Sequence, residues 1–235
     1  MYIILAPPGK EPEIYAMRII DLSHTIENGT LTYKGLPAPV ICDYLSREDS
    51  KKVYEEGTEF QIGKIEMVTN TGTYIDCPFH RYAEGKDFAA LAADLFTDLE
   101  AVKIVVPYRE QTAIDAGYFK GIELTHKAVL LQTGWSEHWG TDTYFENHPF
   151  LTENAARYLS EQQVFLVGID SHNIDDTSVK SRPVHSILLA AEIFIVEHLC
   201  NLEMVPLNNF QFTALPPKFK GVGTFPVRAI AKTIT

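Results

Sequence analysis

The segment 70–80 (NTGTYIDCPFH) constrains this chain more than any other, because a proline separates two side chains that can do acid–base chemistry. Asp76 and His80 are four residues apart, a spacing that makes side chains neighbours on a helix. Pro78 argues against a helix here, since it removes a backbone donor and disfavours helical geometry at Cys77. The chain is therefore expected to be extended or sharply bent at this point.

An extended segment alternates its side chains, so one face would carry four polar groups: Asn70, Tyr74, Asp76 and His80. The last two would be roughly 13 Å apart at a rise of about 3.3 Å per residue, too far to act on one atom. A bend at the proline would bring them together, and loops at strand ends commonly build sites. The pattern predicts a polar site at a bent strand end.

Short apolar runs bounded by turn residues predict the strands, which are 18–22, 60–69, 102–108, 129–131, 164–169, 193–196, 210–213 and 225–231. Helices are predicted at 88–96, with Asp87 as N-cap, at 152–161 and at 186–191. Strands outnumber helices and several follow one another directly. This order predicts an α/β fold with a mixed β-sheet core and flanking helices. The Pro-rich residues 1–17 are predicted to be an arm before a single domain, 18–235, because no linker-like stretch divides the rest.

Composition narrows the class of protein. Apolar residues make up 46% and charged residues 22%, as in soluble globular proteins. The net charge of −11 argues against nucleic acid and anionic membrane surfaces as partners. No apolar run approaches a membrane span, and residues 2–6 lack the features of a secretion signal. Cys42, Cys77 and Cys200 are far apart in sequence, so we expect free thiols and a cytoplasmic location.

Segment 70–80 resembles the signature of the cyclase family of metal-dependent hydrolases, whose best-known member is bacterial kynurenine formamidase. The family pattern is His-x-Gly-Thr-His-x-Asp-x-Pro-x-His, and five positions match here: Gly72, Thr73, Asp76, Pro78 and His80. Asn70 and Tyr74 stand where the family has its first two histidines. Further blocks in the family's order extend the resemblance from about residue 18 to the C-terminus: 20–24, 79–87, 131–135, 168–171, 201–202 and 226–229. The resemblance implies a swivelling β/β/α-type fold.

A second imidazole and carboxylate pair occurs at His185 and Glu197. On one continuous helix these side chains would point about 120° apart. A short helix at 186–191 followed by a strand at 193–196 would instead place them at a helix start and a strand end, which can converge. The family has a His and a Glu at this spacing, so the resemblance implies that Asp76, His185 and Glu197 are metal ligands.

One imidazole and two carboxylates suit a divalent ion such as zinc or manganese, which lowers the pKa of its water and polarises a carbonyl. The resemblance implies two ions in the family's full site, and the first of them also uses the two histidines that are missing here. Asn70 offers only a neutral oxygen and Tyr74 a phenol with a pKa near 10, so we expect one ion per chain, or a harder ion such as manganese or magnesium, with these two residues as possible ligands or lining. The resemblance implies that His80 transfers the proton, a task that an imidazole with a pKa near 6.5 can perform.

These expectations lead to hydrolysis of an amide or formamide bond, or of a small cyclic ester or imide, with arylformamidase as the specific activity. One alternative is a catalytically silent relative that binds a small molecule or acts as an interaction subunit. Another is a metal-free hydrolase that uses Tyr74 and His80 as an acid–base pair. Ordinary roles remain open as well: a turn residue at Asp76, a helix start at His185 and an exposed strand end at Glu197.

The expected partner is a small-molecule substrate. Aromatic and imidazole side chains could wall its pocket, and the candidates are His24, Tyr33, Phe79 and Trp135. The resemblance also implies a homo-oligomer, either a dimer or a tetramer.

Overall fold

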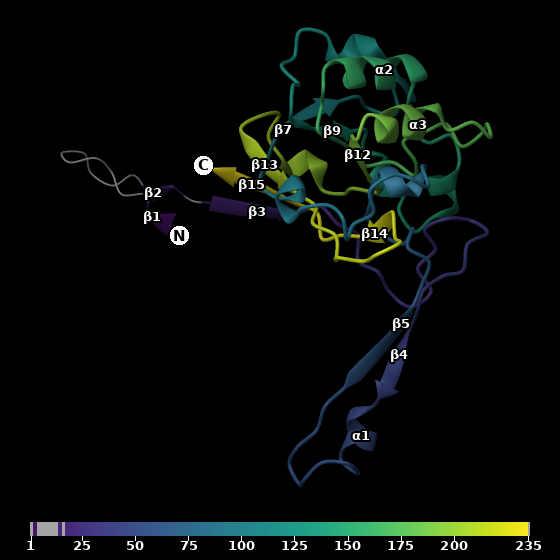
Figure 1. The fold of residues 1–235 in the computed structure, drawn as a ribbon, viewed down its shortest axis with the longest axis vertical. Coiled ribbons are helices and arrows are strands. Elements are labelled where there is room, and N and C mark those ends of the chain that lie inside the picture. The colour runs from purple at the N-terminus through teal and green to yellow at the C-terminus, as the bar shows by residue number, and fades with distance from the viewer. Residues whose placement is uncertain (1, 4–13, 16, 235) are drawn as a thin grey trace, which may run out of the picture.

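The fold is built on one mixed sheet, which Figure 1 shows beside the helices. Its nine strands have the order β14-β6-β12-β11-β9-β7-β13-β15-β3. The computed structural model describes residues 2–3, 14–15 and 17–234. The four central strands run parallel: β7 (Leu99–Val105), β9 (Ala128–Gln132), β11 (Leu166–Ile169) and β12 (Phe194–Glu197). The outer strands are antiparallel: β6 (Tyr74–Asp76), β14 (Thr224–Pro226), β13 (Phe210–Thr213), β15 (Ile230–Ile234) and β3 (Met17–Asp21). This sheet confirms the predicted mixed α/β class.

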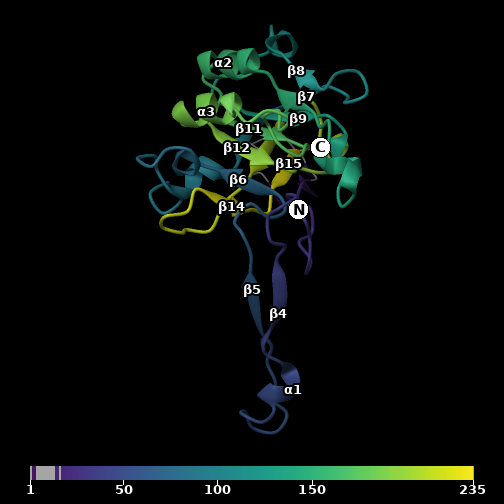
Figure 2. The same cartoon turned by 90° about the vertical axis from the view of Figure 1, so that its right-hand side faces the viewer.

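Two helices pack together on one face of the parallel strands (Figure 2). They are α2 (Glu153–Glu161) and α3 (Pro183–Ala190). Val102 and Ile104 of β7 belong to the apolar core under these helices, whereas Ala101 belongs to the core on the opposite face. Side chains that alternate along each strand thus supply two apolar layers. The predicted helices at 152–161 and 186–191 are confirmed, and the Thr152 hydroxyl caps α2 by accepting from the Ala155 N–H at 3.1 Å.

A hairpin projects far from the sheet (Figures 1 and 2). It consists of β4 (Val40–Leu45) and β5 (Ile62–Glu66), and α1 (Arg47–Ser50) lies in the segment that joins them. The predicted strand at 60–69 therefore exists only at its centre, and it pairs outside the main sheet. Every residue of β5 is exposed. This segment instead belongs to a hairpin whose two faces are both exposed in a single copy of the chain.

The predicted helix at 88–96 is wrong, because the structure has only a short 3₁₀ helix there, η2 (Ala93–Phe96). Phe88 and Phe96 are both buried in the core, and this burial holds the segment on an irregular path. Asp87 still accepts a hydrogen bond from the Ala90 N–H, as a capping residue would. The predicted strand at 225–231 is two strands, β14 and β15, which pair with β6 and with β13 and β3.

The remaining elements are short. They are β1 (Tyr2–Ile3), β2 (Ile14–Tyr15), β8 (Ala113–Ile114), β10 (Phe150–Leu151), η1 (Pro78–His80), η3 (Ala116–Phe119), η4 (Trp135–His138), η5 (Asp142–Phe145) and η6 (Leu202–Met204). The predicted arm, residues 1–17, falls largely outside the described residues, so the division of the chain at residue 17 stays a prediction. Cys42, Cys77 and Cys200 are free, as predicted. No helix in the described part of the chain has the length and apolarity that a membrane crossing requires.

Candidate active site

The predicted bend at Pro78 exists, and it brings the signature residues to one place. Asp76 ends β6, and the chain then turns through η1, which Pro78 begins and His80 ends. Glu197 ends β12, the strand that pairs with β6. His185 lies in the first turn of α3, which precedes β12 in the chain. The predicted break between helix and strand therefore gives His185 and Glu197 their convergence.

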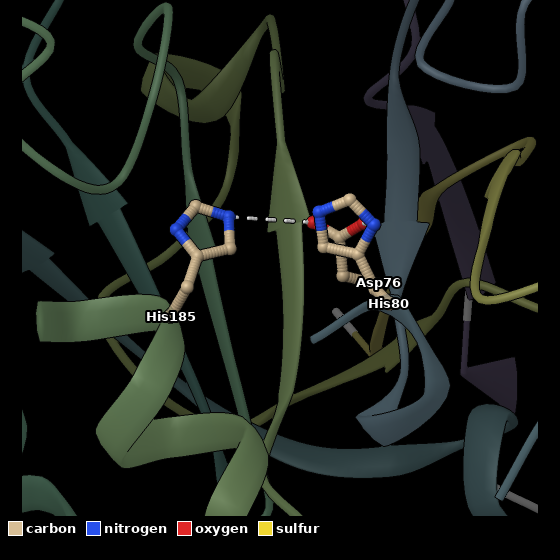
Figure 3. A group of neighbouring side chains, drawn as sticks. All are labelled: Asp76, His80 and His185. Atoms are coloured by element: carbon tan, nitrogen blue, oxygen red, sulfur yellow. Dashed lines mark ion pairs between the residues drawn. The ribbon is translucent and has the colours of Figure 1, made fainter. Parts of the chain in front are cut away.

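Asp76 lies at the centre of the site (Figure 3). The Nε2 atom of His185 is 3.7 Å from Asp76 Oδ2 and 3.7 Å from Glu197 Oε1. The Nδ1 atom of His80 is 3.8 Å from Asp76 Oδ1. Asp76, His80 and His185 each offer one possible ligand atom, and these three atoms lie within 4.8 Å of one another. The structure thus brings together the predicted ligands and the predicted proton-transfer residue.

The charges of the site fit a bound cation. Asp76 and Glu197 are fully buried, and Asp76 Oδ2 has no hydrogen-bond partner among the described residues. Burial raises the pKa of Glu197 to about 7, while the nearby His185 opposes this rise. A buried carboxylate oxygen without a partner is costly, and a metal ion removes that cost. The unpartnered oxygen and Glu197 Oε1 each lie 3.7 Å from the same imidazole nitrogen, His185 Nε2, so one cation could be shared by the three groups.

Asp175 orients His185, and sequence reasoning missed it. The Nδ1–H of His185 donates to Asp175 Oδ2 at 2.6 Å, which leaves Nε2 directed towards Asp76. Asp175 also accepts from the backbone N–H groups of Val184 at 2.8 Å and His185 at 3.0 Å, so it caps α3. Burial lowers the pKa of His185, but the hydrogen bond to Asp175 and the nearby carboxylates of Asp76 and Glu197 outweigh burial and raise the pKa to about 10. A carboxylate behind a ligating histidine fixes its tautomer and orientation.

Thr224 links His80 to Asp76, and it too was missed. Its hydroxyl donates to Asp76 Oδ1 and lies 2.7 Å from His80 Nδ1. Because this hydroxyl has a single proton, its oxygen accepts from the Nδ1–H of His80. The other ring nitrogen, Nε2, is then the free basic atom. Gly223 is required beside it, since a Cβ at that position would lie 2.3 Å from the backbone nitrogen of His80.

Tyr74 is buried and donates to Glu197 Oε2 at 2.5 Å, with the Tyr33 hydroxyl 3.0 Å away. Burial first, and then the charge of Glu197, raise the pKa of Tyr74 well above its usual value near 10. The phenol is therefore a neutral donor that orients a carboxylate. This arrangement argues against Tyr74 and His80 as a metal-free acid–base pair. Asn70 contributes its side chain to the wall of the adjoining pocket.

The site opens into a pocket of about 680 Å³. Its lining includes Tyr33, Asn70, Tyr74, His80 and His185. A volume of this size suits a small-molecule ligand. Tyr33 is thus the one predicted wall residue that the structure places in this lining.

The other three predicted wall residues lie elsewhere. His24 stacks on Trp139 with ring centroids 4.1 Å apart and lines a neighbouring pocket. Trp135 is buried and donates its indole N–H to a backbone carbonyl at 3.0 Å. Phe79 packs against the apolar core. The sequence offered these side chains as candidates because aromatic rings often line substrate pockets. Aromatic rings pack in protein cores just as readily, and the sequence alone does not separate the two roles.

Comparisons with known proteins agree with this architecture. A sequence model of the Cyclase family matches residues 20–176. The chain is 28% identical over 217 residues to kynurenine formamidase of Bacillus cereus (strain ATCC 14579), covering 92% of this chain and 97% of the relative. Among solved structures, isatin hydrolase A from Labrenzia aggregata has a TM-score of 0.80 and 20% identity, covering 93% of this chain and 94% of that chain. A "predicted metal-dependent hydrolase" from Bacillus stearothermophilus has a TM-score of 0.72 and 26% identity, covering 92% and 98%.

These relatives are described as hydrolases, which supports an enzyme and gives no support to a catalytically silent subunit. The name of the Bacillus stearothermophilus structure and the group of Asp76, His80 and His185 together support a divalent metal. The family match covers more than half of the chain, and the expected resemblance is confirmed. This chain belongs to the Cyclase family.

Proposed function

We propose that the chain is a metal-dependent hydrolase of an amide or formamide bond, or of a small cyclic ester or imide, with arylformamidase as the specific activity. The observation that carries the proposal is the unpartnered, buried Oδ2 of Asp76, which faces His185 Nε2 beside a ligand-sized pocket. Similarity to kynurenine formamidases supports the formamide as substrate class. The chain also shares its fold with isatin hydrolase A, whose name describes a hydrolase.

Asp76, His185 and Glu197 would hold one zinc or manganese ion per chain. Such an ion supplies Lewis acidity, which makes its water more acidic and polarises the substrate carbonyl. Tyr74 and the Ile174 N–H occupy the two oxygens of Glu197 from the protein side and hold this carboxylate in place. Asp175 does the same for His185. The chain therefore fixes its ligands in advance, so little reorganisation accompanies metal binding.

His80 would be the general base and then the general acid. Its Nδ1–H is held by Thr224, so Nε2 is available to accept a proton from the attacking water. The oxygen of that water bonds to the carbonyl carbon, the C–N bond breaks, and Nε2 returns the proton to the leaving nitrogen. The His80 side chain is 34% exposed and lines the pocket, so it is accessible to a bound substrate.

The test is turnover of a panel of formamides, lactones and imides by the zinc- or manganese-supplied protein, with and without a chelator. His80→Gln is expected to lower kcat by about 10²–10⁴-fold while the metal content stays at one ion per chain. The matched control is His126→Asn, which changes an exposed histidine in a left-handed backbone conformation that Asn tolerates. Full turnover by His80→Gln, or turnover that a chelator does not reduce, would refute the mechanism.

We also propose that the protein is a cytoplasmic homo-oligomer, a dimer or tetramer formed with other copies of this chain. The three free cysteines support the location. The hairpin supports the assembly, because a lone two-stranded hairpin is marginal in water and this one exposes eight large apolar side chains. They are Val40, Ile41, Tyr44, Val53, Tyr54, Phe60, Ile62 and Ile65.

A further inference from the structure

Among the described residues, three basic side chains line the pocket above the proposed metal site, and no acidic residue does. They are Arg81, Lys180 and Arg182. The whole chain has 31 acidic and only 20 basic residues, so the charge of this pocket lining is opposite in sign to the net charge of the chain. Within the described residues none of the three forms an ion pair with a carboxylate. No carboxylate of the described residues therefore neutralises these three charges.

The three cations are fixed to different degrees. Arg182 braces the loop before α3, since its Nη1 group donates to the backbone carbonyls of Asp176 at 3.2 Å and Ser181 at 2.9 Å. Arg81 donates from Nε to the Ser186 hydroxyl at 3.1 Å, which positions its guanidinium beside the start of α3. Lys180 is exposed in the same loop as Arg182 and has no hydrogen bond from its ammonium group to a described residue. Two cations, Arg81 and Lys180, thus have donors to offer a ligand.

The floor of the same site has the opposite charge. Asp76, Asp175 and Glu197 are all buried there, with exposed fractions of 0–1%. An anionic ligand would be repelled by this floor, and the metal would offset only part of that charge. Cations at the wall of a cleft attract an anion and direct it. An arginine also matches the two oxygens of a carboxylate through its fork of N–H donors.

We infer that Arg81 and Lys180, with Arg182 bracing the loop that carries Lys180, form a carboxylate-binding wall, so that the substrate carries an anionic carboxylate away from the bond that is cleaved. This inference rests on the proposed hydrolase and narrows its substrate class. The carboxylate is held at the wall by Arg81 and Lys180, and the scissile carbonyl reaches His80 and the metal ligands. The protein selects acids over neutral amides of the same shape.

The test compares 2-formamidobenzoate with its uncharged methyl ester. Wild type is expected to have a kcat/KM at least 10-fold higher for the carboxylate, and this preference should shrink as salt is raised. Lys180→Gln and Arg81→Gln should each reduce the preference by about 5- to 20-fold. Lys218→Gln, an exposed cation that lies in none of the pockets described above, should leave the preference unchanged. Equal kcat/KM for the two substrates in wild type would overturn the inference.

A binding measurement separates this inference from the proposed reaction. Calorimetric titration of the metal-supplied protein with benzoate and with benzamide requires no turnover. If neither formamide is hydrolysed but benzoate binds at least 5-fold more weakly to Lys180→Gln than to wild type, the reaction is wrong and the carboxylate wall stands. If the methyl ester is hydrolysed while benzoate binding is absent or unchanged in Lys180→Gln, the wall is wrong and the hydrolase stands. If benzoate binds only as a ligand of the metal, its affinity is also unchanged in Lys180→Gln, and this result likewise counts against the wall.

Discussion

Asp175→Asn should weaken both the fold and the metal site, because Asp175 serves each of them. The Asp175 carboxylate is 1% exposed and accepts three hydrogen bonds, from the His185 ring at 2.6 Å and from two backbone N–H groups at 2.8 and 3.0 Å. Asparagine keeps the shape but has no charge, and its NH₂ group must face a donor. Losing one charge-assisted bond and leaving a buried donor unpaired costs about 3 kcal/mol of unfolding free energy.

The assay has two parts. Thermal unfolding of the metal-free protein should show a Tm lower by about 6–12 °C, since 1 kcal/mol shifts a protein of this size by about 2–4 °C. Competition titration with zinc should show an affinity lower by about 10- to 100-fold, because the imidazole loses the group that fixes its orientation. Asp176→Asn, a change at the neighbouring and more exposed carboxylate, is the matched control. A variant that loses stability but binds zinc as wild type does would refute the role of Asp175 at the metal.

Three further outcomes are expected. Burial lowers the pKa of His172 to about 3, so between pH 3 and 6.5 only the unfolded chain binds a proton here, and the stability falls as the pH drops. The free energy of unfolding measured in urea should therefore fall by about 2 kcal/mol from pH 7 to pH 5 because of this residue. In His172→Gln this contribution to the pH dependence should be absent. Thr224→Val removes the hydroxyl that holds His80 and should lower kcat by about 10- to 100-fold at unchanged metal content; a wild-type kcat would exclude this role. The double change Tyr44→Lys and Val53→Lys should reduce the mass measured by light scattering to that of a smaller assembly, whereas an unchanged mass would show that the hairpin is not the contact.

The parts of the site that follow one another closely in sequence could be predicted. Pro78 forced a bend, and that bend is η1, which brings His80 back to Asp76. The change from helical to β-branched residues after Ala190 separated α3 from β12, and this break places His185 against Glu197. Both predictions depend only on how neighbouring residues restrict the backbone, and a single sequence is enough to apply such rules.

The contacts that depend on distant pairing could not be predicted. Asp175 and Thr224 reach the site from loops and strands whose neighbours are fixed only by the order of the sheet, and no local pattern marks either residue. The helix expected at 88–96 failed for a related reason, because burial of Phe88 and Phe96 outweighed the local helical preference. The wall of cations also needed the structure, since Arg81 and Lys180 are 99 positions apart in the chain and only the fold places both in the lining of one pocket.

The most direct test of the metal site is anomalous diffraction from a crystal of the protein grown with manganese. The account predicts one strong peak per chain within bonding distance of Asp76, His185 and Glu197, and no peak there in an Asp76→Asn variant. A map without a peak at these three side chains, or with manganese bound only elsewhere on the chain, would contradict the account.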